Sequence, residues 1–121
     1  MLDVEIDDTT GIVTLSPGDA LTKEDFEYAA QRVDDYLEKA GEVKGMIVST
    51  RKFPGWESFG AMLTHLRFIR EHHRDVEKVA MVTDSPIGEV GEKVAGHFVS
   101  AEVRHFPFDD LKDARKWIRE G

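Results

Sequence analysis

Apolar and polar residues alternate at the start of the chain, which is the pattern of a strand with one buried face. Leu2, Val4 and Ile6 alternate with acidic residues, and residues 9–11 form a polar, glycine-containing break before a second apolar run at residues 12–16. A period of two residues predicts β-strands, and the short break predicts that the two strands form a hairpin.

The period changes to that of a helix a few residues later. Thr22 is placed to cap this helix, with Asp25 three residues later as the acidic member of a capping box. The helix should end near Gly41. The apolar positions share one face, opposite the acidic ones, and are Phe26, Ala29, Ala30, Val33, Leu37 and Ala40.

Three later apolar segments predict strands, and helical periodicity fills the intervals between and after them. The runs at residues 45–49 and 78–83 are continuous, as in strands covered on both faces, and residues 102–106 form a fifth strand. Helical spacing recurs in three segments, which are residues 58–74, residues 86–98 after Ser85, and a last helix capped by Asp109 or Asp110.

The helix predicted over residues 58–74 carries aromatic residues on two sides. Its core stripe is Phe59, Met62, Leu63, Leu66 and Ile69. Phe68 lies about 180° from that stripe, next to His65 and His72, on the side predicted to face solvent. An aromatic residue there is either a scattered exposed side chain or part of an interaction patch. His72 and His73 are predicted to form a solvated helix end.

The elements follow one another in the order ββαβαβαβα. Strands that alternate with helices favour parallel pairing through right-handed crossovers. A length of 121 residues is typical of one domain. The sequence therefore predicts the α/β class, with a single domain over residues 1–121, a mixed, mostly parallel five-stranded sheet and four helices.

The chain is acidic and contains no cysteine. It has 16 Lys and Arg against 24 Asp and Glu, for a net charge of −8. DNA and RNA are bound mainly through basic residues, so we expect no nucleic-acid partner. The lack of cysteine excludes disulfides, thiolate metal sites and cysteine nucleophiles. The first residues lack the pattern of a signal peptide, and no run approaches the length of about 20 apolar residues that spans a bilayer, so we expect a cytoplasmic protein.

The sequence contains no motif that indicates catalysis or cofactor binding. It lacks the dinucleotide fingerprint, the phosphate loop and the nucleophile elbow. His65 and His72 are separated by roughly 10 Å along one helix, too far apart to share a metal ion. His97 and His105 are interpreted as structural residues, although a cluster of either one with a buried carboxylate in a deep pocket would favour a hydrolase. We therefore expect no enzymatic activity, no cofactor and no metal.

The most unusual segment follows the third predicted strand and occupies residues 50–60. It combines two cations with three aromatic residues in an otherwise acidic chain, namely Arg51, Lys52, Phe53, Trp56 and Phe59. Ligands of parallel α/β sheets bind beyond the carboxyl ends of the strands, where this loop should lie. The alternative is that Trp56 and Phe59 fold back as a hydrophobic staple and the first core residue of the next helix.

Four segments, in their order, match one known pattern. They are the strand Gly45-Met46-Ile47-Val48-Ser49, the helix of residues 59–73, the run of residues 76–84 and the ending of residues 101–106. Together they resemble the SpoIIAA-like proteins, a bacterial family related to the STAS domains of anti-sigma-factor antagonists, over essentially the full length. The resemblance implies a (βα) superhelical fold around a mixed sheet, no known enzymatic activity and a shape related to lipid-binding CRAL-TRIO domains. It also implies binding of small hydrophobic ligands or membranes, often as dimers.

One position departs from the pattern of the antagonists. Antagonist-type STAS domains carry Asp-Ser-Ser-Gly at the start of the helix after the third strand, and a partner kinase phosphorylates a serine there. This chain has Glu57-Ser58-Phe59-Gly60, so that Phe59 replaces the usual phosphoacceptor and Ser58 remains. A phosphate on Ser58 would lie favourably at a helix N-terminus, which makes Ser58 the candidate phosphorylation site.

We therefore expect a non-enzymatic binding domain for a small apolar or lipid-like ligand, with peripheral contact to a membrane surface as a further expectation. Aromatic and apolar side chains would line the contact and two cations would meet an anionic head group, the predicted residues being Arg51, Lys52, Phe53, Trp56, Phe59 and Leu63. The alternative is a STAS-type regulatory interaction module that binds a kinase or sigma-factor partner, with Ser58 as its switch. A homodimer fits either function.

Overall fold

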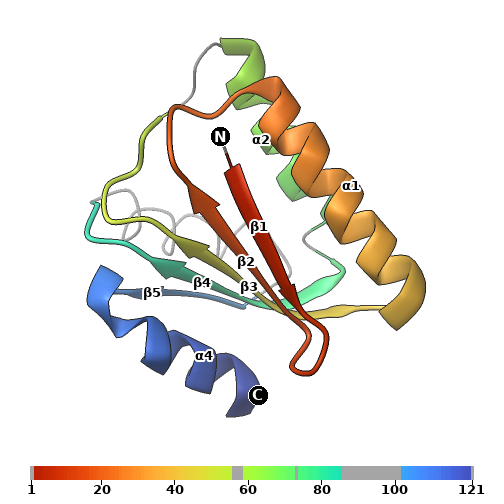
Figure 1. The fold of residues 1–121 in the computed structure, drawn as a ribbon, viewed down its shortest axis with the longest axis vertical. Helices are drawn as coiled ribbons and strands as arrows, with labels where there is room; N and C mark the ends of the chain where they lie inside the picture. The colour runs from red at the N-terminus through yellow and green to blue at the C-terminus, as the bar shows by residue number, and fades with distance from the viewer. Residues whose placement is uncertain (1, 56–58, 73, 86–101, 121) are drawn as a thin grey trace.

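The computed structural model describes residues 2–55, 59–72, 74–85 and 102–120 (Figure 1). Its five strands form one sheet whose spatial order, β1-β2-β3-β4-β5, is also the chain order. The first two strands pair antiparallel and all later neighbours pair parallel. This confirms the predicted α/β class with a mixed, mostly parallel sheet. The strands are β1 (Leu2–Asp7), β2 (Ile12–Pro17), β3 (Val43–Ser49), β4 (Val76–Val82) and β5 (Glu102–Phe106).

The described helices cover both faces of the sheet (Figure 1). The helices α1 (Lys23–Ala40) and α2 (Phe59–His72) lie on one face, and α4 (Leu111–Glu120) lies on the other. The helix predicted for residues 86–98 lies outside the described residues. The predicted aspartate cap of the last helix is wrong, because Asp109 and Asp110 lie inside a 3₁₀ turn, η1 (Phe108–Asp110), that leads into α4.

The predicted ends of α1 are confirmed. The Thr22 side chain accepts a hydrogen bond from the backbone N–H of Asp25 at 3.1 Å, and the Asp25 carboxylate accepts one from the N–H of Thr22 at 2.9 Å. This reciprocal pair satisfies two N–H groups that the helix itself leaves without acceptors. Gly41 ends the helix with φ of 84°, a conformation that glycine adopts without steric cost.

Two apolar clusters hold the layers together, one on each face of the sheet. Gly45 on β3 allows α4 to approach the sheet closely, since a Cβ atom there would overlap Cγ2 of Ile118 and lie 2.7 Å from its Cδ1. The cluster under α1 and α2 includes Val4, Val13, Leu15, Phe26, Val33, Met46 and Phe68. The cluster under α4 includes Ile12, Ile47, Ala80, Val82, Phe106, Ala114 and Ile118.

The side of α2 that was predicted to face solvent is in fact buried against α1. Phe68 is 7% exposed, and its ring centroid lies 6.5 Å from that of Phe26 on α1. His65 stacks on the same Phe26 ring with centroids 4.5 Å apart. The prediction was wrong because this side of α2 packs against α1, with Phe68 in the same cluster as Val13 and Met46 of the sheet. Periodicity within α2 alone does not reveal such a contact with a neighbouring helix.

His72 also differs from its prediction, because it is 4% exposed and not part of a solvated helix end. Its Nδ1 lies 2.8 Å from the carbonyl oxygen of Phe68, and its Nε2 lies 2.9 Å from Oδ1 of Asp34 on α1. A carbonyl and an ionised carboxylate both only accept hydrogen bonds. Both ring nitrogens of His72 thus lie within hydrogen-bonding distance of an acceptor, and the contact with Asp34 links the end of α2 to α1.

Candidate functional site

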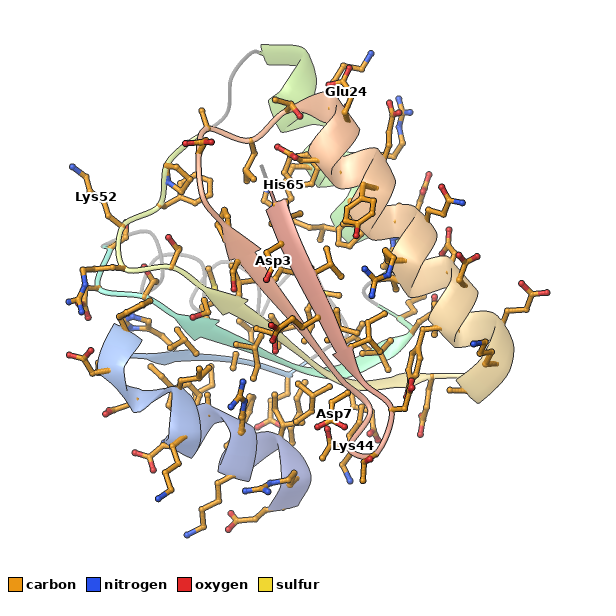
Figure 2. The ribbon with its side chains drawn as sticks, in the orientation of Figure 1. Asp3, Asp7, Glu24, Lys44, Lys52 and His65 are labelled. Carbon is orange, nitrogen blue, oxygen red and sulfur yellow. The ribbon has the colours of Figure 1, made fainter. Side chains whose placement is uncertain are left out.

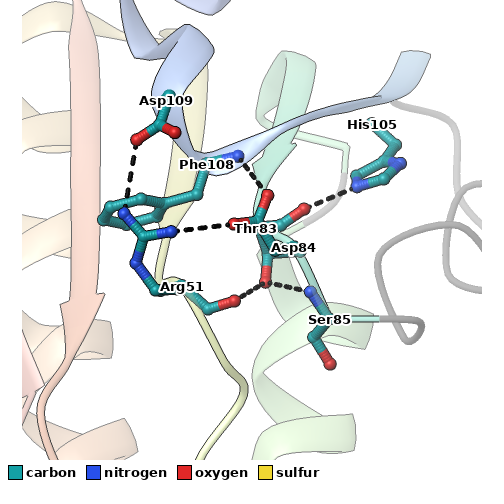
Figure 3. A network of polar contacts seen from close by, with 7 residues as sticks. All are labelled: Arg51, Thr83, Asp84, Ser85, His105, Phe108 and Asp109. Atoms are coloured by element: carbon teal, nitrogen blue, oxygen red, sulfur yellow. Dashed lines mark hydrogen bonds and ion pairs between the residues drawn. The ribbon is translucent and has the colours of Figure 1, made fainter.

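The loops that follow β3, β4 and β5 meet at one edge of the sheet, because parallel strands end on the same side. Arg51 follows β3, Thr83 and Asp84 follow β4, and Asp109 lies in η1 after β5. Figure 3 shows that these residues form one polar network. This carboxyl edge is where ligands bind in open α/β sheets, and it is where the sequence placed the candidate loop.

Arg51 connects the three loops. Its Nη1 lies 3.1 Å from Oδ2 of Asp84, and its Nη2 lies 3.3 Å from Oδ1 of Asp109. The guanidinium also lies over the ring of Phe108, 4.7 Å from its centroid, and the backbone N–H of Phe108 donates to Asp84 at 3.0 Å. One cation thus bridges carboxylates from two loops, although the Arg51 side chain is 62% exposed.

Thr83 is only 3% exposed and connects the backbones of the loops after β3 and β4 through hydrogen bonds. Its hydroxyl donates to the carbonyl of Arg51 at 3.3 Å and accepts from the N–H of Ser85 at 3.1 Å. Its own carbonyl accepts from Nε2 of His105 at 2.7 Å, so Nε2 carries a proton. The N–H of Asp84 donates to the carbonyl of Arg51 at 3.1 Å. These bonds give His105 a structural part, as predicted.

The described residues of the predicted binding loop point in different directions. Arg51 belongs to the network, whereas Lys52 is exposed and extends away from the sheet (Figure 2). Phe53 is half-buried and packs against the core cluster under α1 and α2. Gly55 has φ of 84°, and its carbonyl accepts a hydrogen bond from the N–H of Leu21 at 2.8 Å. That bond ties the loop to the segment before α1.

The remaining predicted residues fall outside what the structure describes. Trp56 and Ser58 lie outside the described residues, and so do the side chains of Phe59 and Leu63 in α2. Their proposed roles in ligand binding or phosphorylation stay predictions. The described part of α2 starts at Phe59, which directly follows Ser58 in the sequence.

Sequence reasoning assigned no functional role to Asp84, Phe108 or Asp109. One signal could have suggested Asp84, since it is a charged residue directly after an interior parallel strand. Asp84 and its partner Arg51 are 33 positions apart in the sequence, and Arg51 and Asp109 are 58 positions apart. Partners at such separations are set by the register of the parallel strands, which the local pattern does not contain.

The network offers a surface of paired charges. In the part of the chain that the structure describes, no group of three or more His, Asp or Glu residues is arranged to hold a metal ion. No helix within the described ranges is long and apolar enough to cross a membrane. Both carboxylates of the network are bonded to Arg51, and Asp84 also accepts a backbone N–H. The charges of the network are therefore paired with one another within the chain.

Replacing Asp84 with asparagine should loosen the three loops without unfolding the domain. The exposed ion pair with Arg51 is lost, at a cost of about 0.5–1 kcal/mol, while an amide oxygen can still accept the N–H of Phe108. We expect faster hydrogen exchange at the amide of Phe108, measured by NMR. Asp113→Asn on α4 is the matched control, and equal exchange in the two variants would show that the pair does not hold the loops.

Comparisons with known proteins agree on the fold. The sequence profile of a family described as SpoIIAA-like matches residues 12–119. No curated protein matches the chain. An uncharacterized protein with a SpoIIAA-like fold from Shewanella loihica is 22% identical with a TM-score of 0.76, over 98% of this chain and 92% of that one. The Bacillus cell fate determinant SpoIIAA, in its phosphorylated form, is 15% identical with a TM-score of 0.59, over 94% and 98%.

Proposed function

Because this chain belongs to the SpoIIAA-like family, we propose that it is a STAS-type regulatory module that binds a partner protein through the carboxyl edge of its sheet. The observation that carries the proposal is the network in which Arg51 joins Asp84 and Asp109. It holds three loops in one arrangement, and a preorganised surface loses less conformational freedom on binding. The similar Bacillus protein is a cell fate determinant that occurs in a phosphorylated form, which supports a regulatory role.

The proposed activity is binding and not catalysis. A general acid or base needs a carboxyl group whose protonation is tuned to the reaction and whose proton can reach a substrate. In the network, Asp84 and Asp109 instead accept bonds from Arg51, so both carboxylates already have a partner within the chain. The proposal accordingly includes no cofactor.

Ser58 is the proposed switch. It directly precedes Phe59, the first described residue of α2, and the first turn of the described helix contains no acidic residue. The N–H groups of a first helical turn attract phosphate, and the cations Arg51 and Lys52 belong to the same loop. Phosphorylation would add a double negative charge beside the docking surface and would change its affinity for the partner.

An apolar or lipid-like ligand at the same loop, with membrane contact, is the rival hypothesis and has less support. Phe53 packs against the core of its own domain. The guanidinium of Arg51 is bonded to two carboxylates, which an anionic head group would have to displace. A net charge of −8 also opposes approach to an anionic membrane surface.

The test compares two charge reversals in affinity capture from the source cells. Lys52→Glu reverses an exposed charge in the same loop as Arg51, and Lys39→Glu makes the same change on the last turn of α1. We expect a protein retained by the wild type to be retained about tenfold less by Lys52→Glu and equally by Lys39→Glu.

That protein is then purified and titrated by calorimetry against Ser58→Asp and Ser58→Ala. A change in affinity with Ser58→Asp alone supports the switch. If no protein depends on Lys52, or if a fatty acid binds the wild type and no protein does, the proposal is wrong.

A further inference from the structure

A groove lies away from the carboxyl edge, between α4 and the hairpin of β1 and β2. Its volume is about 810 Å³, within the range of about 300–1,000 Å³ that is typical of small-molecule sites. Two cross-strand pairs contribute to its lining on the sheet side, Glu5 with Thr14 and Asp7 with Ile12. Figure 2 shows Asp7 at the end of the hairpin, toward the C-terminal end of α4.

The alternation of β1 explains the acidic wall of this groove. Leu2 and Val4 are buried in the cluster under α1 and α2, on one face of the sheet. Successive side chains of a strand point to opposite faces, so Glu5 and Asp7 lie on the face that α4 covers. Ile12 and Thr14 of β2 are buried between these carboxylates and the rest of the sheet. The hairpin therefore presents negative charge above a buried floor.

The helical period of α4 explains the basic wall. Ala114 and Ile118 are buried against the sheet, and the residues that follow each of them, Arg115 and Arg119, line the groove. At about 100° per residue, the cations of α4 gather on this flank and its acidic residues on the other. The cations are Lys112, Arg115, Lys116 and Arg119, and the acidic residues are Asp113 and Glu120.

The charges on the two walls face each other without closing into an ion pair. Among the described residues, the hydrogen bonds and salt bridges involve none of Glu5, Arg115 and Arg119. The pKa of Asp7 is held below its ordinary value chiefly by a hydrogen bond from the N–H of Thr9, and the positive charge of Arg115 contributes. The charge of Arg115 thus reaches Asp7 across the groove, while the exposed side chains of Glu5, Arg115 and Arg119 remain available to a ligand.

We propose that this groove binds a small zwitterion of the amino-acid or short-peptide class. Arg115 and Arg119 donate hydrogen bonds to the carboxylate of the ligand, a pairing that guanidinium groups make in bidentate form. Glu5 accepts from its ammonium group. A ligand with both charges satisfies both walls, whereas an anion or a cation alone would meet a wall of its own sign. The site is separate from the carboxyl edge, so its failure would leave the proposed function untouched.

The test is an NMR titration of the amide signals with triglycine, which carries both terminal charges and no side chains. N-acetyl-triglycine lacks the ammonium group and triglycine amide lacks the carboxylate. We expect saturable shifts around Glu5, Thr14 and Arg115 with triglycine, and affinities about tenfold weaker for each blocked peptide. L-alanine distinguishes the two sources of zwitterion, since equal affinity for it indicates free amino acids and weaker affinity indicates peptides.

Variants then test which charged residues of the groove contact the ligand. Arg119→Gln and Glu5→Gln should each weaken the binding of triglycine about tenfold. Lys39→Gln on α1 and Asp3→Asn on β1 remove the same charges outside the groove and should leave the binding unchanged. The proposal is overturned if neither triglycine nor L-alanine gives saturable shifts, if the blocked peptides bind as tightly as triglycine, or if the groove variants behave like their controls.

Discussion

Replacing Phe68 with alanine should lower the free energy of unfolding by about 3–5 kcal/mol, the usual cost of removing a buried aromatic side chain. Phe68 is 7% exposed and lies between two other rings, with its centroid 6.5 Å from Phe26 and 4.5 Å from His72. Truncation would leave a cavity where α1 meets α2. Urea denaturation followed by circular dichroism measures the change, provided that the denaturant slope stays constant.

Two further variants provide comparisons for the loss of stability expected with Phe68→Ala. Phe68→Leu keeps most of the apolar volume and should cost less than the alanine variant, about 1–2 kcal/mol. Tyr28→Ala removes an aromatic ring that is 48% exposed on α1, and should cost within about 1 kcal/mol. If Phe68→Ala were no more destabilising than Tyr28→Ala, Phe68 would belong to the surface, as the periodicity of α2 by itself suggests.

The contrast between α1 and α2 shows what local pattern determines. In α1 the cap, the apolar face and the terminal glycine all act within a few residues, so Thr22, Asp25 and Gly41 could be assigned from the sequence. The second apolar side of α2 depends on which helix lies beside it. That neighbour is set by the order of the strands, and Phe68 was therefore assigned to the wrong environment.

The candidate site likewise has one part that the local pattern predicts and another part that depends on the tertiary fold. The position of the loop after β3 follows from the alternation of strands and helices, so the carboxyl edge could be predicted. The partners of Arg51 could not be, because Asp84 and Asp109 reach it only once β3, β4 and β5 are paired in register. The predicted contact of Arg51 with the anionic head group of a ligand stays a prediction, and within the chain Arg51 contacts two carboxylates.

Lowering the pH should destabilise the domain through His65. Burial lowers the pKa of His65 to about 4 in the folded protein, from 6.5 as its ordinary value. Between these two values the unfolded chain binds a proton that the folded chain excludes, so stability falls as the pH falls. The stabilisation is complete above pH 6.5 and is lost progressively down to about pH 4. The shift corresponds to roughly 3 kcal/mol.

Urea denaturation across this pH range, compared between the wild type and His65→Phe, isolates this histidine. A phenylalanine ring can keep the stack on Phe26, where the His65 ring now lies with centroids 4.5 Å apart, but it does not titrate. Carboxylates with lowered pKa values, such as Asp25, also lose stabilisation in acid, but they do so equally in both proteins. The stability of His65→Phe relative to the wild type should therefore rise as the pH falls from 6.5 to about 4. A constant difference over that range would mean that His65 is protonated as readily in the folded chain as in the unfolded one, and that its ring is not shielded from water between α1 and α2.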